Sequence, residues 1–447
     1  MASAVLLRQK TRFLPDINQR SNSSELSQQS RVKEKVKQLN SVCPENEKNL
    51  TTTISEDDIA KFRNPLHQHL CLSMLREGFH RSFEEFFSLL QRWHTARLVA
   101  GEDSVLWLQR PLEEQPHKLH MMKEHLTHAE AAERSYQYAE VYENYLDLAK
   151  FFSEQEDRWL QQHFYKLSLL SARKVKMDFG RREAEANAHI GQLYLEQGDL
   201  ELAQEHYEVF HKLVEGQSWQ DESGCTLQSC ACEGLWRVYT LLAQRQLQIK
   251  DYKSAIQIFT KAYDMAKEAD DRKMEGEAAY SLALAYQIMG DHGTAKQFLS
   301  MCVEISKSLG DTDSVGRAYK AISKSLESEC NMNETIQYLE KYVEISQESN
   351  QNQNLQDACM GLGSIYSSIG EFDGSCEYFK QAYEVACGLG SMPLLQKAQV
   401  CVGTSKAHSI LQTYAAHVVD NTPKSIQTLI RWKETREEFH KPQYETK

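Results

Sequence analysis

Small side chains recur at regular intervals through the middle of this 447-residue chain. One series is spaced by 52, 40, 40 and 40 residues and consists of Ala203, Ala255, Ala295, Thr335 and Ser375. A second series lies twelve positions earlier in each unit and consists of Gly191, Ala243, Ala283, Ser323 and Gly363. Two antiparallel helices approach closely only where their side chains are small. The paired series therefore predicts a repeated helical hairpin with one tight crossing in each copy.

Two further positions recur within each unit and complete the hairpin. Eight residues after the first small residue lies a side chain that can begin a new helix: Asp199, Asp251, Asp291, Asn331 and Glu371. Four residues after the second small residue lies a large apolar side chain that can fill the crossing: Tyr207, Phe259, Leu299, Leu339 and Phe379. A single hairpin leaves an apolar face exposed, so the units must stack to bury it. We assign repeat packing to eight of the small residues: Gly191, Ala203, Ala243, Ala255, Ala283, Ala295, Gly363 and Ser375.

The distribution of proline favours helices throughout this region. The chain has 8 prolines, and none of them lies between residues 117 and 392. A proline inside a helix costs about 3 kcal/mol, and prolines commonly mark the turns of β-proteins. A proline-free stretch of this length predicts an all-α fold in which one helix follows another.

Three units share a short motif at the first crossing: Ile190-Gly191-x-x-Tyr194, Leu282-Ala283-x-x-Tyr286 and Leu362-Gly363-x-x-Tyr366. From about Tyr138 to Gly390 the chain resembles the tetratricopeptide repeat superfamily. The resemblance implies an α-solenoid, a right-handed superhelix of helical hairpins, with units of 40 residues in place of the usual 34. The unit centred on Thr335 departs from the motif, because Ser323 and Leu326 replace the small residue and the tyrosine.

The remaining sequence surrounds this array. We expect a disordered segment over residues 1–55, a helical N-terminal region over 56–135 and an array of about six units over 136–390, with its 40-residue period starting at 243. Residues 391–447 should form capping helices with a polar outer face, and a tail. The 52-residue interval places an insert within Gly216–Thr226. In the N-terminal region, Ser82-Phe-Glu-Glu85 has the pattern of a capping box.

Charge and motifs argue against several classes of function. The net charge of −12 disfavours nucleic-acid binding. The sequence contains no run of 18 apolar residues, so no membrane span is predicted. No Gly-rich phosphate loop and no nucleophile–base–acid set is present, so we predict a protein that is not an enzyme and takes no cofactor or small-molecule substrate. Cys225, Cys230 and Cys232 lack a second pair at zinc-ligand spacing, which favours free thiols and no metal site. Eleven cysteines without an export signal favour reduced thiols in the cytoplasm.

Protein binding is the function that remains. In the tetratricopeptide architecture the first helix of each hairpin lines the concave side, at positions three before, one after and four after its small residue. These positions hold Ala188, Gln192 and Leu195, then Thr240, Gln244 and Leu247, then Tyr280, Leu284 and Gln287, then Lys320, Lys324 and Glu327, then Met360, Ser364 and Ser367. We assign a partner-binding groove to Gln192, Leu195, Tyr280, Leu284, Gln287, Arg317, Lys320 and Lys324. The basic stripe of Arg317, Lys320 and Lys324 is either a solvated helix face or a clamp for an acidic segment.

The non-repeat segments narrow the resemblance. Residues 82–87, 91–93, 107–119, 391–395, 406–408 and 431–436 are similar to one family of tetratricopeptide proteins from motile cilia and sperm flagella. That resemblance implies an axonemal scaffold in the cytoskeleton of the cilium or flagellum. It implies partners among axonemal proteins, inner-arm dynein heavy chain and accessory subunits, and a role in flagellum assembly, beating and sperm motility. A soluble cytoplasmic adaptor or a dynein-assembly factor stays open as the alternative.

Overall fold

A computed structural model describes residues 65–221 and 223–435 of the chain. The contacts between residues divide the chain into two compact units, Met1–His69 and Leu70–Lys447. The segment predicted to be disordered, residues 1–55, lies outside the described residues. Regular secondary structure in the described part is helical throughout, apart from one isolated bridge between Gln220 and Thr226. The prediction of an all-α fold is therefore confirmed.

The N-terminal region contains α4 (Leu66–Arg76), α5 (His80–Ala100), the short α6 (Val105–Leu108) and α7 (Pro116–Arg134). A single 3-10 turn, Leu112–Glu114, precedes α7. Helix α5 packs against α7, and Phe86 and Leu89 on one side with Leu119 and Met122 on the other are fully buried. The capping-box prediction is wrong, because α5 begins at His80 and Ser82 lies inside its first turn.

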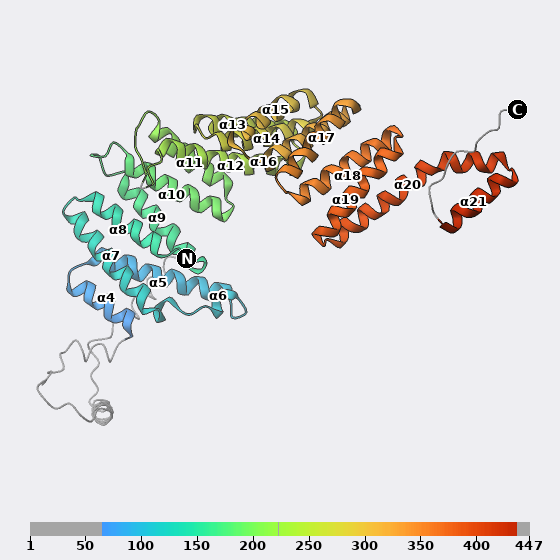
Figure 1. Ribbon diagram of the computed structural model, residues 1–447. Helices are drawn as coiled ribbons and strands as arrows, with labels where there is room; N and C mark the ends of the chain where they lie inside the picture. Colours follow the sequence, from blue (N-terminus) through green and yellow to red (C-terminus); the bar gives the residue numbers. More distant parts are fainter. Residues whose placement is uncertain (1–64, 222, 436–447) are drawn as a thin grey trace, which may run out of the picture. The chain divides into compact units, whose positions relative to one another are not determined.

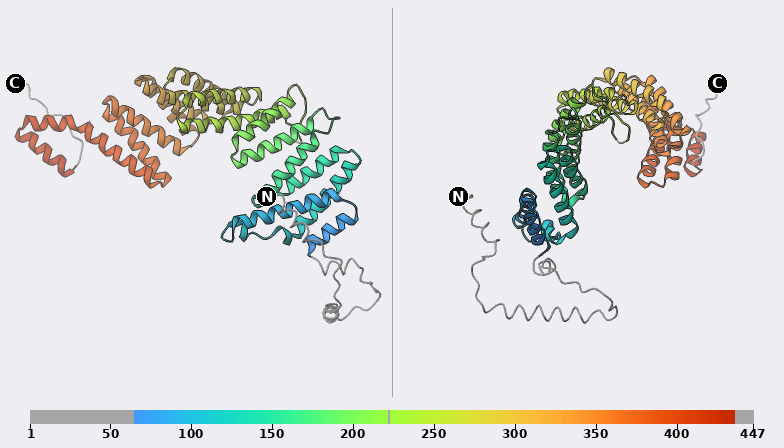
Figure 2. Two further views of the ribbon diagram at one scale, coloured as in Figure 1. Left: turned by 180° about the vertical axis from the view of Figure 1, so that it is seen from behind. Right: turned by 90° about the vertical axis from the view of Figure 1, so that its left-hand side faces the viewer.

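Six pairs of helices follow one another from Tyr138 to Leu389 (Figure 1). They are α8 (Tyr138–Phe151) with α9 (Arg158–Ala172), α10 (Arg181–Gln197) with α11 (Leu200–Val214), α12 (Leu227–Ile249) with α13 (Tyr252–Glu268), α14 (Arg272–Met289) with α15 (His292–Leu309), α16 (Thr312–Ser328) with α17 (Met332–Glu348), and α18 (Asn352–Ile369) with α19 (Phe372–Leu389). Each helix packs on its pair partner and on the neighbouring pair. The views in Figure 2 show the same succession from two other sides. The pairs therefore bury their apolar faces by stacking, as the repeat pattern requires.

The recurring small residues lie where paired helices cross. A Cβ added to Gly363 of α18 would lie 2.6 Å from the Phe379 ring of α19. One added to Gly191 of α10 would lie 2.9 Å from the Tyr207 ring of α11. The Ser375 hydroxyl of α19 donates a hydrogen bond to the Gly363 carbonyl across 2.7 Å. The large ring of the second helix thus occupies the space that the missing side chain of the first helix leaves.

The predicted helix starts are confirmed in every unit. Asp199, Asp251, Asp291, Asn331 and Glu371 are the N-cap residues of α11, α13, α15, α17 and α19. The side-chain oxygen of Asp251, Asp291 and Asn331 accepts a hydrogen bond from the backbone amide three residues later. The preceding Gly198, Gly290 and Gly370 adopt left-handed backbone angles, which glycine does without steric cost.

The insert between α11 and α12 is a closed loop. The backbone amide of Leu227 donates to the Trp219 carbonyl at 2.9 Å, beside the bridge between Gln220 and Thr226. Within the loop, Asp221 Oδ1 accepts from the backbone amides of Ser223 and Cys225. The loop is therefore tied at its base, directly at the start of α12.

The C-terminal part consists of α20 (Met392–Asp420) and α21 (Pro423–Thr435). Helix α20 is unbroken through 29 residues, as the absence of a turn signal predicts, and Pro423 begins the last helix. Its outer face differs from the expected polar cap, since Val400 is 67% and Val419 is 83% exposed. No helix in the described part of the chain is both long enough and apolar enough to cross a membrane.

Candidate partner-binding surface

A hollow of about 470 Å³ lies among α12, α14, α15 and α16. Three successive first helices form most of its wall, with Thr240 and Gln244 from α12, Tyr280 and Leu284 from α14, and Arg317 from α16. All five belong to the inward positions or the basic stripe described from the sequence. The 40-residue period places these positions at the same height on neighbouring hairpins, so they meet although they are far apart in the chain.

Arg317 is held in place on the wall of this hollow. Its guanidinium lies 5.4 Å from the centre of the Tyr280 ring, within cation–π distance. Its Nη2 donates to Ser314 Oγ at 2.7 Å, and its Nε lies 3.4 Å from Asp313 Oδ2. Burial raises the pKa of the Tyr280 phenol, and the nearby Arg317 charge opposes that shift. The hollow therefore presents a neutral aromatic ring beside a positioned cation.

Two polar atoms at the hollow are buried without a hydrogen-bond partner among the described residues: Trp236 Nε1 and Thr240 Oγ1. Both can donate a hydrogen bond. A buried donor that has lost water and gained no acceptor costs about 1–3 kcal/mol. An oxygen acceptor from outside the chain can reach the pair only when the side chains that cover the two atoms move aside.

The sequence did not single out Trp236. Trp236 lies seven residues before Ala243 and four residues, or about one helical turn, before the inward position Thr240. Units of 40 residues have longer helices than units of 34, so the inward stripe continues for a further turn. Extending the stripe by that turn would have identified Trp236.

Other predicted groove residues have contacts within the array. Gln287 Nε2 donates to the Ala321 carbonyl at 3.0 Å and to Ser325 Oγ at 2.8 Å, which joins α14 to α16. Gln192 accepts from Tyr207 and donates to Glu196, and Leu195 lies half-buried on the same helix, away from the hollow. These three residues support the packing of their helices.

The basic stripe is partly neutralised by neighbouring acids. Lys320 Nζ lies 2.5 Å from Asp357 Oδ2 of α18, and Arg317 is paired with Asp313. Lys324 is exposed, and no ion pair of its side chain is present in the described part of the chain. The stripe therefore carries much less free positive charge than its sequence suggests.

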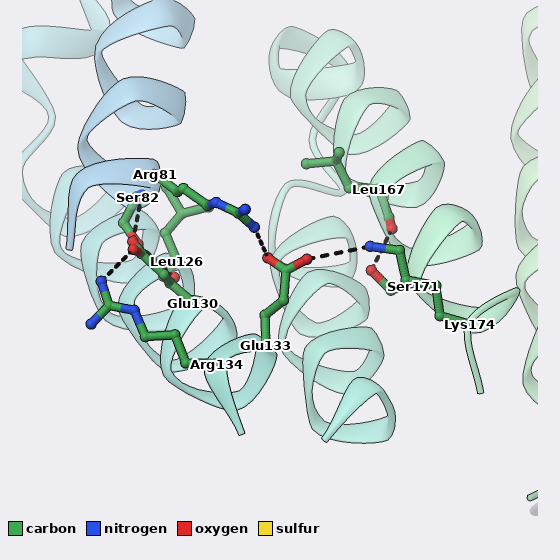
Figure 3. Close-up of polar contacts among 9 residues, drawn as sticks. All are labelled: Arg81, Ser82, Leu126, Glu130, Glu133, Arg134, Leu167, Ser171 and Lys174. Carbon is green, nitrogen blue, oxygen red and sulfur yellow. Dashed lines mark hydrogen bonds and ion pairs between the residues drawn. The ribbon is translucent and has the colours of Figure 1, made fainter. Parts of the chain in front are cut away.

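A second hollow, of about 450 Å³, lies beside α5, α7 and α8 and is lined by Arg81, Glu130, Glu133 and Arg134 together with His80, Tyr136 and Tyr138. Figure 3 shows the polar contacts of its charged residues. Glu133 Oε2 accepts from Arg81 at 2.7 Å, while its Oε1 lies 3.3 Å from Lys174 Nζ of the segment after α9. Glu130 Oε2 accepts from both the backbone amide and the hydroxyl of Ser82 at 2.8 Å.

The charges around this second hollow satisfy one another. Glu130 Oε1 also accepts from Arg134 Nη2 at 2.7 Å. Desolvation acts to raise the pKa of Glu130, but the hydrogen bonds from Ser82 and Arg134 outweigh it and lower the pKa below its usual value. The cluster holds α5, α7 and the segment after α9 together, so we assign it a structural role.

These features define a class of protein: a helical-repeat scaffold built of tetratricopeptide-type hairpins that offers surface for protein–protein contact. A family model described as "Tetratricopeptide repeat" matches residues 184–208 and 356–386. A model described as "Anaphase-promoting complex subunit 5" matches residues 239–324. The protein named tetratricopeptide repeat protein 29 from Macaca fascicularis is 42% identical over 383 residues, which cover 86% of this chain and 81% of that protein. The chain belongs to the tetratricopeptide repeat protein 29 family.

Weaker similarities are found with a protein from another organism and with a solved structure. Tetratricopeptide repeat protein 29 from Trypanosoma brucei brucei (strain 927/4 GUTat10.1) is 23% identical over 354 residues, covering 78% of this chain and 68% of that protein. Among solved structures, BtubC (BKLC) from P. vanneervenii has a TM-score of 0.38 and 16% identity, and covers 52% of this chain and 92% of that one.

Proposed function

We propose that this chain is a non-enzymatic scaffold of the axoneme in motile cilia and sperm flagella. In this proposal it associates with inner-arm dynein and supports flagellum assembly and beating. Membership of the family supports the proposal, together with the resemblance of the non-repeat segments. The proposed location is the cytoskeleton of the cilium or flagellum.

The hollow among α12, α14, α15 and α16 is the proposed partner-binding groove. The observation that carries this assignment is the pair of buried donors without acceptors, Trp236 Nε1 and Thr240 Oγ1. A peptide segment of a partner would supply carbonyl or carboxylate oxygens to them and pack an apolar side chain on Tyr280 and Leu284. Arg317, at the wall of the hollow, is already paired with Asp313 and therefore adds only a weak preference for an acidic residue.

The groove can be tested by removing the two donors. Trp236→Phe combined with Thr240→Val deletes both donors, and we expect a loss of at least tenfold in retention of the tagged chain on demembranated axonemes. Glu304→Gln, an exposed change on α15 outside the lining of the hollow, is the matched control and should bind as the wild type does. Equal retention of the double variant and the wild type would reject this groove.

The location requires a separate experiment. The full chain should stay with axonemes after detergent and moderate salt, and cross-linking mass spectrometry should join it to inner-arm dynein subunits. Complete extraction by mild detergent, with imaging that places the tagged chain only in the cell body, would favour a cytoplasmic adaptor or dynein-assembly factor instead.

A further inference from the structure

Three side chains with metal-binding atoms meet beside the insert, one helical turn from Trp236 along α12. They are His211 of α11, Cys232 of α12 and Glu268 of α13, and their ligand atoms all lie within 4.8 Å of one another. Each comes from a different helix, and these three helices pack on one another in sequence. The cluster therefore lies at the joint where the 52-residue interval interrupts the regular period.

The three side chains differ in exposure in a way that suits an ion. Cys232 is fully buried, His211 is half-buried and Glu268 is exposed. The thiol thus forms the floor of the cluster and the carboxylate its solvent edge. An ion could enter from water past Glu268 and still leave most of its shell inside the protein.

Two polar side chains converge on one carboxylate oxygen at this point. His211 Nε2 lies 2.9 Å from Glu268 Oε1, to which it can donate, and 3.3 Å from Gln228 Nε2, which is a second donor to the same oxygen. Gln228 Nε2 donates a hydrogen bond to Glu268 Oε1. Exchanging the positions of the amide nitrogen and oxygen of Gln228 would bring two oxygen acceptors into contact. In the present orientation Gln228 Oε1 is buried without a partner among the described residues.

We propose that His211, Cys232 and Glu268 bind one Zn²⁺ ion, which ties the insert-bearing joint of α11, α12 and α13 together. Imidazole, thiolate and carboxylate are the ligands that zinc takes in proteins, with bonds of about 2.0–2.3 Å. Calcium and magnesium prefer oxygen ligands alone, and a thiolate with imidazole disfavours them. With the ion in place, both His211 Nε2 and Glu268 Oε1 direct lone pairs at the metal. The side-chain amide of Gln228 then donates its hydrogen bond to Glu268 alone.

Zinc binding must overcome the cost of ionising the thiol. Burial raises the pKa of Cys232 to about 12, so without metal the sulfur keeps its proton. Coordination forms a Zn–S bond and releases that proton to solvent. This inference departs from the expectation of free thiols, because the other two ligands come from helices 21 and 36 residues away and spacing along the chain does not reveal them.

The test uses the purified full chain and the metal alone. After loading with Zn²⁺ and exhaustive dialysis, elemental analysis should find one zinc per chain, and Zn²⁺ should raise the unfolding temperature. Co²⁺ should give a thiolate-to-metal charge-transfer band, which Cys232→Ser abolishes. Cys230→Ser is the matched control, because that thiol lies on the same helix but outside the cluster, and it should keep both the zinc and the band.

Two milder variants keep the test decisive if Cys232→Ser does not fold. Glu268→Gln and His211→Gln change side chains that are not fully buried, and each should weaken Zn²⁺ binding at least tenfold in calorimetric titration. Zinc well below one per chain in the wild type would overturn the proposal. So would unchanged binding in both of these variants, or a loss of zinc in Cys230→Ser equal to that in Cys232→Ser.

Discussion

The N-terminal helices and the repeat array both pack on apolar side chains, but they differ in what else lies at their joints. In the array, from α10 to α19, paired helices meet at residues with little or no side chain, such as Ala295 and Gly363. In the N-terminal region, α5, α7 and the segment around α9 meet at buried acids. Glu130 and Asp157 are each only 6% exposed, and Asp157 is paired with Lys118.

The two kinds of joint are vulnerable to different changes. A crossing of small residues fails when volume or charge is added, because the facing helix has no room to move. A joint of buried acids fails when one partner is removed, because the remaining buried donors then lose their hydrogen bonds. Substitutions at each kind of joint therefore test this distinction.

Ala295→Glu should have the largest effect. Ala295 is fully buried at the crossing of α14 and α15, and a carboxylate there has no described partner. We expect a loss of about 3–5 kcal/mol in the free energy of unfolding, measured by urea denaturation. An unchanged midpoint would mean that the helices do not cross at the small residues.

Glu130→Ala should be the next most damaging change. It removes the acceptor of the Ser82 amide and hydroxyl and of Arg134, for an expected loss of about 2–4 kcal/mol. Glu133→Gln, at a more exposed acid of the same cluster, is the control and should cost about 0–1 kcal/mol. Equal losses from both variants would show that burial does not decide the strength of this joint.

Gly363→Ala isolates the steric part of a crossing with one methyl group. The new Cβ would lie 2.6 Å from the Phe379 ring, so we expect a loss of about 1–3 kcal/mol. Gly403→Ala is the matched control, because Gly403 lies inside α20 with no heavy atom within 4 Å of its added Cβ, and it should stabilise by about 0.5–1 kcal/mol. Thermal unfolding of both variants separates a packing effect from helix propensity, and a stabilised Gly363→Ala would contradict the crossing.

The helix caps of the array should give the smallest effect, a loss of stability in acid. Hydrogen bonds from Ser254, Thr294 and Ser314 lower the pKa of Asp251, Asp291 and Asp311. A lowered folded-state pKa adds stability above the unfolded value of about 3.9, and that stability disappears as the pH falls through the folded-state pKa.

Urea midpoints measured at pH 7 and pH 3 check this prediction. Replacing the three aspartates by asparagine keeps a capping oxygen but removes the titration. The triple variant should therefore lose less stability between pH 7 and pH 3 than the wild type. An equal acid loss in both chains would mean that other carboxylates dominate.

Patterns in the sequence predicted the features that recur from one repeat to the next. They did not predict the contacts between polar groups that occur at a single place in the chain. The N-caps followed from an offset of eight residues, and all five lie where that offset places them. Ser82 has the local pattern of a cap, yet its hydroxyl and amide both contact Glu130, 48 residues away. Tyr280 and Leu284, which are inward positions, and Arg317, which belongs to the basic stripe, lie at one hollow, whereas Gln287 has its contacts within the array.

The amino-acid sequence is sufficient to predict the helical pairs, their caps and the small residues at their crossings. These features depend on residues at constant offsets within one hairpin, where helix geometry alone sets the distances. The three-dimensional packing is needed to see that Lys320 is paired with Asp357, that Trp236 borders the hollow, and that His211, Cys232 and Glu268 converge. Those encounters depend on how neighbouring hairpins stack and on side-chain rotamers, which no spacing along the chain specifies.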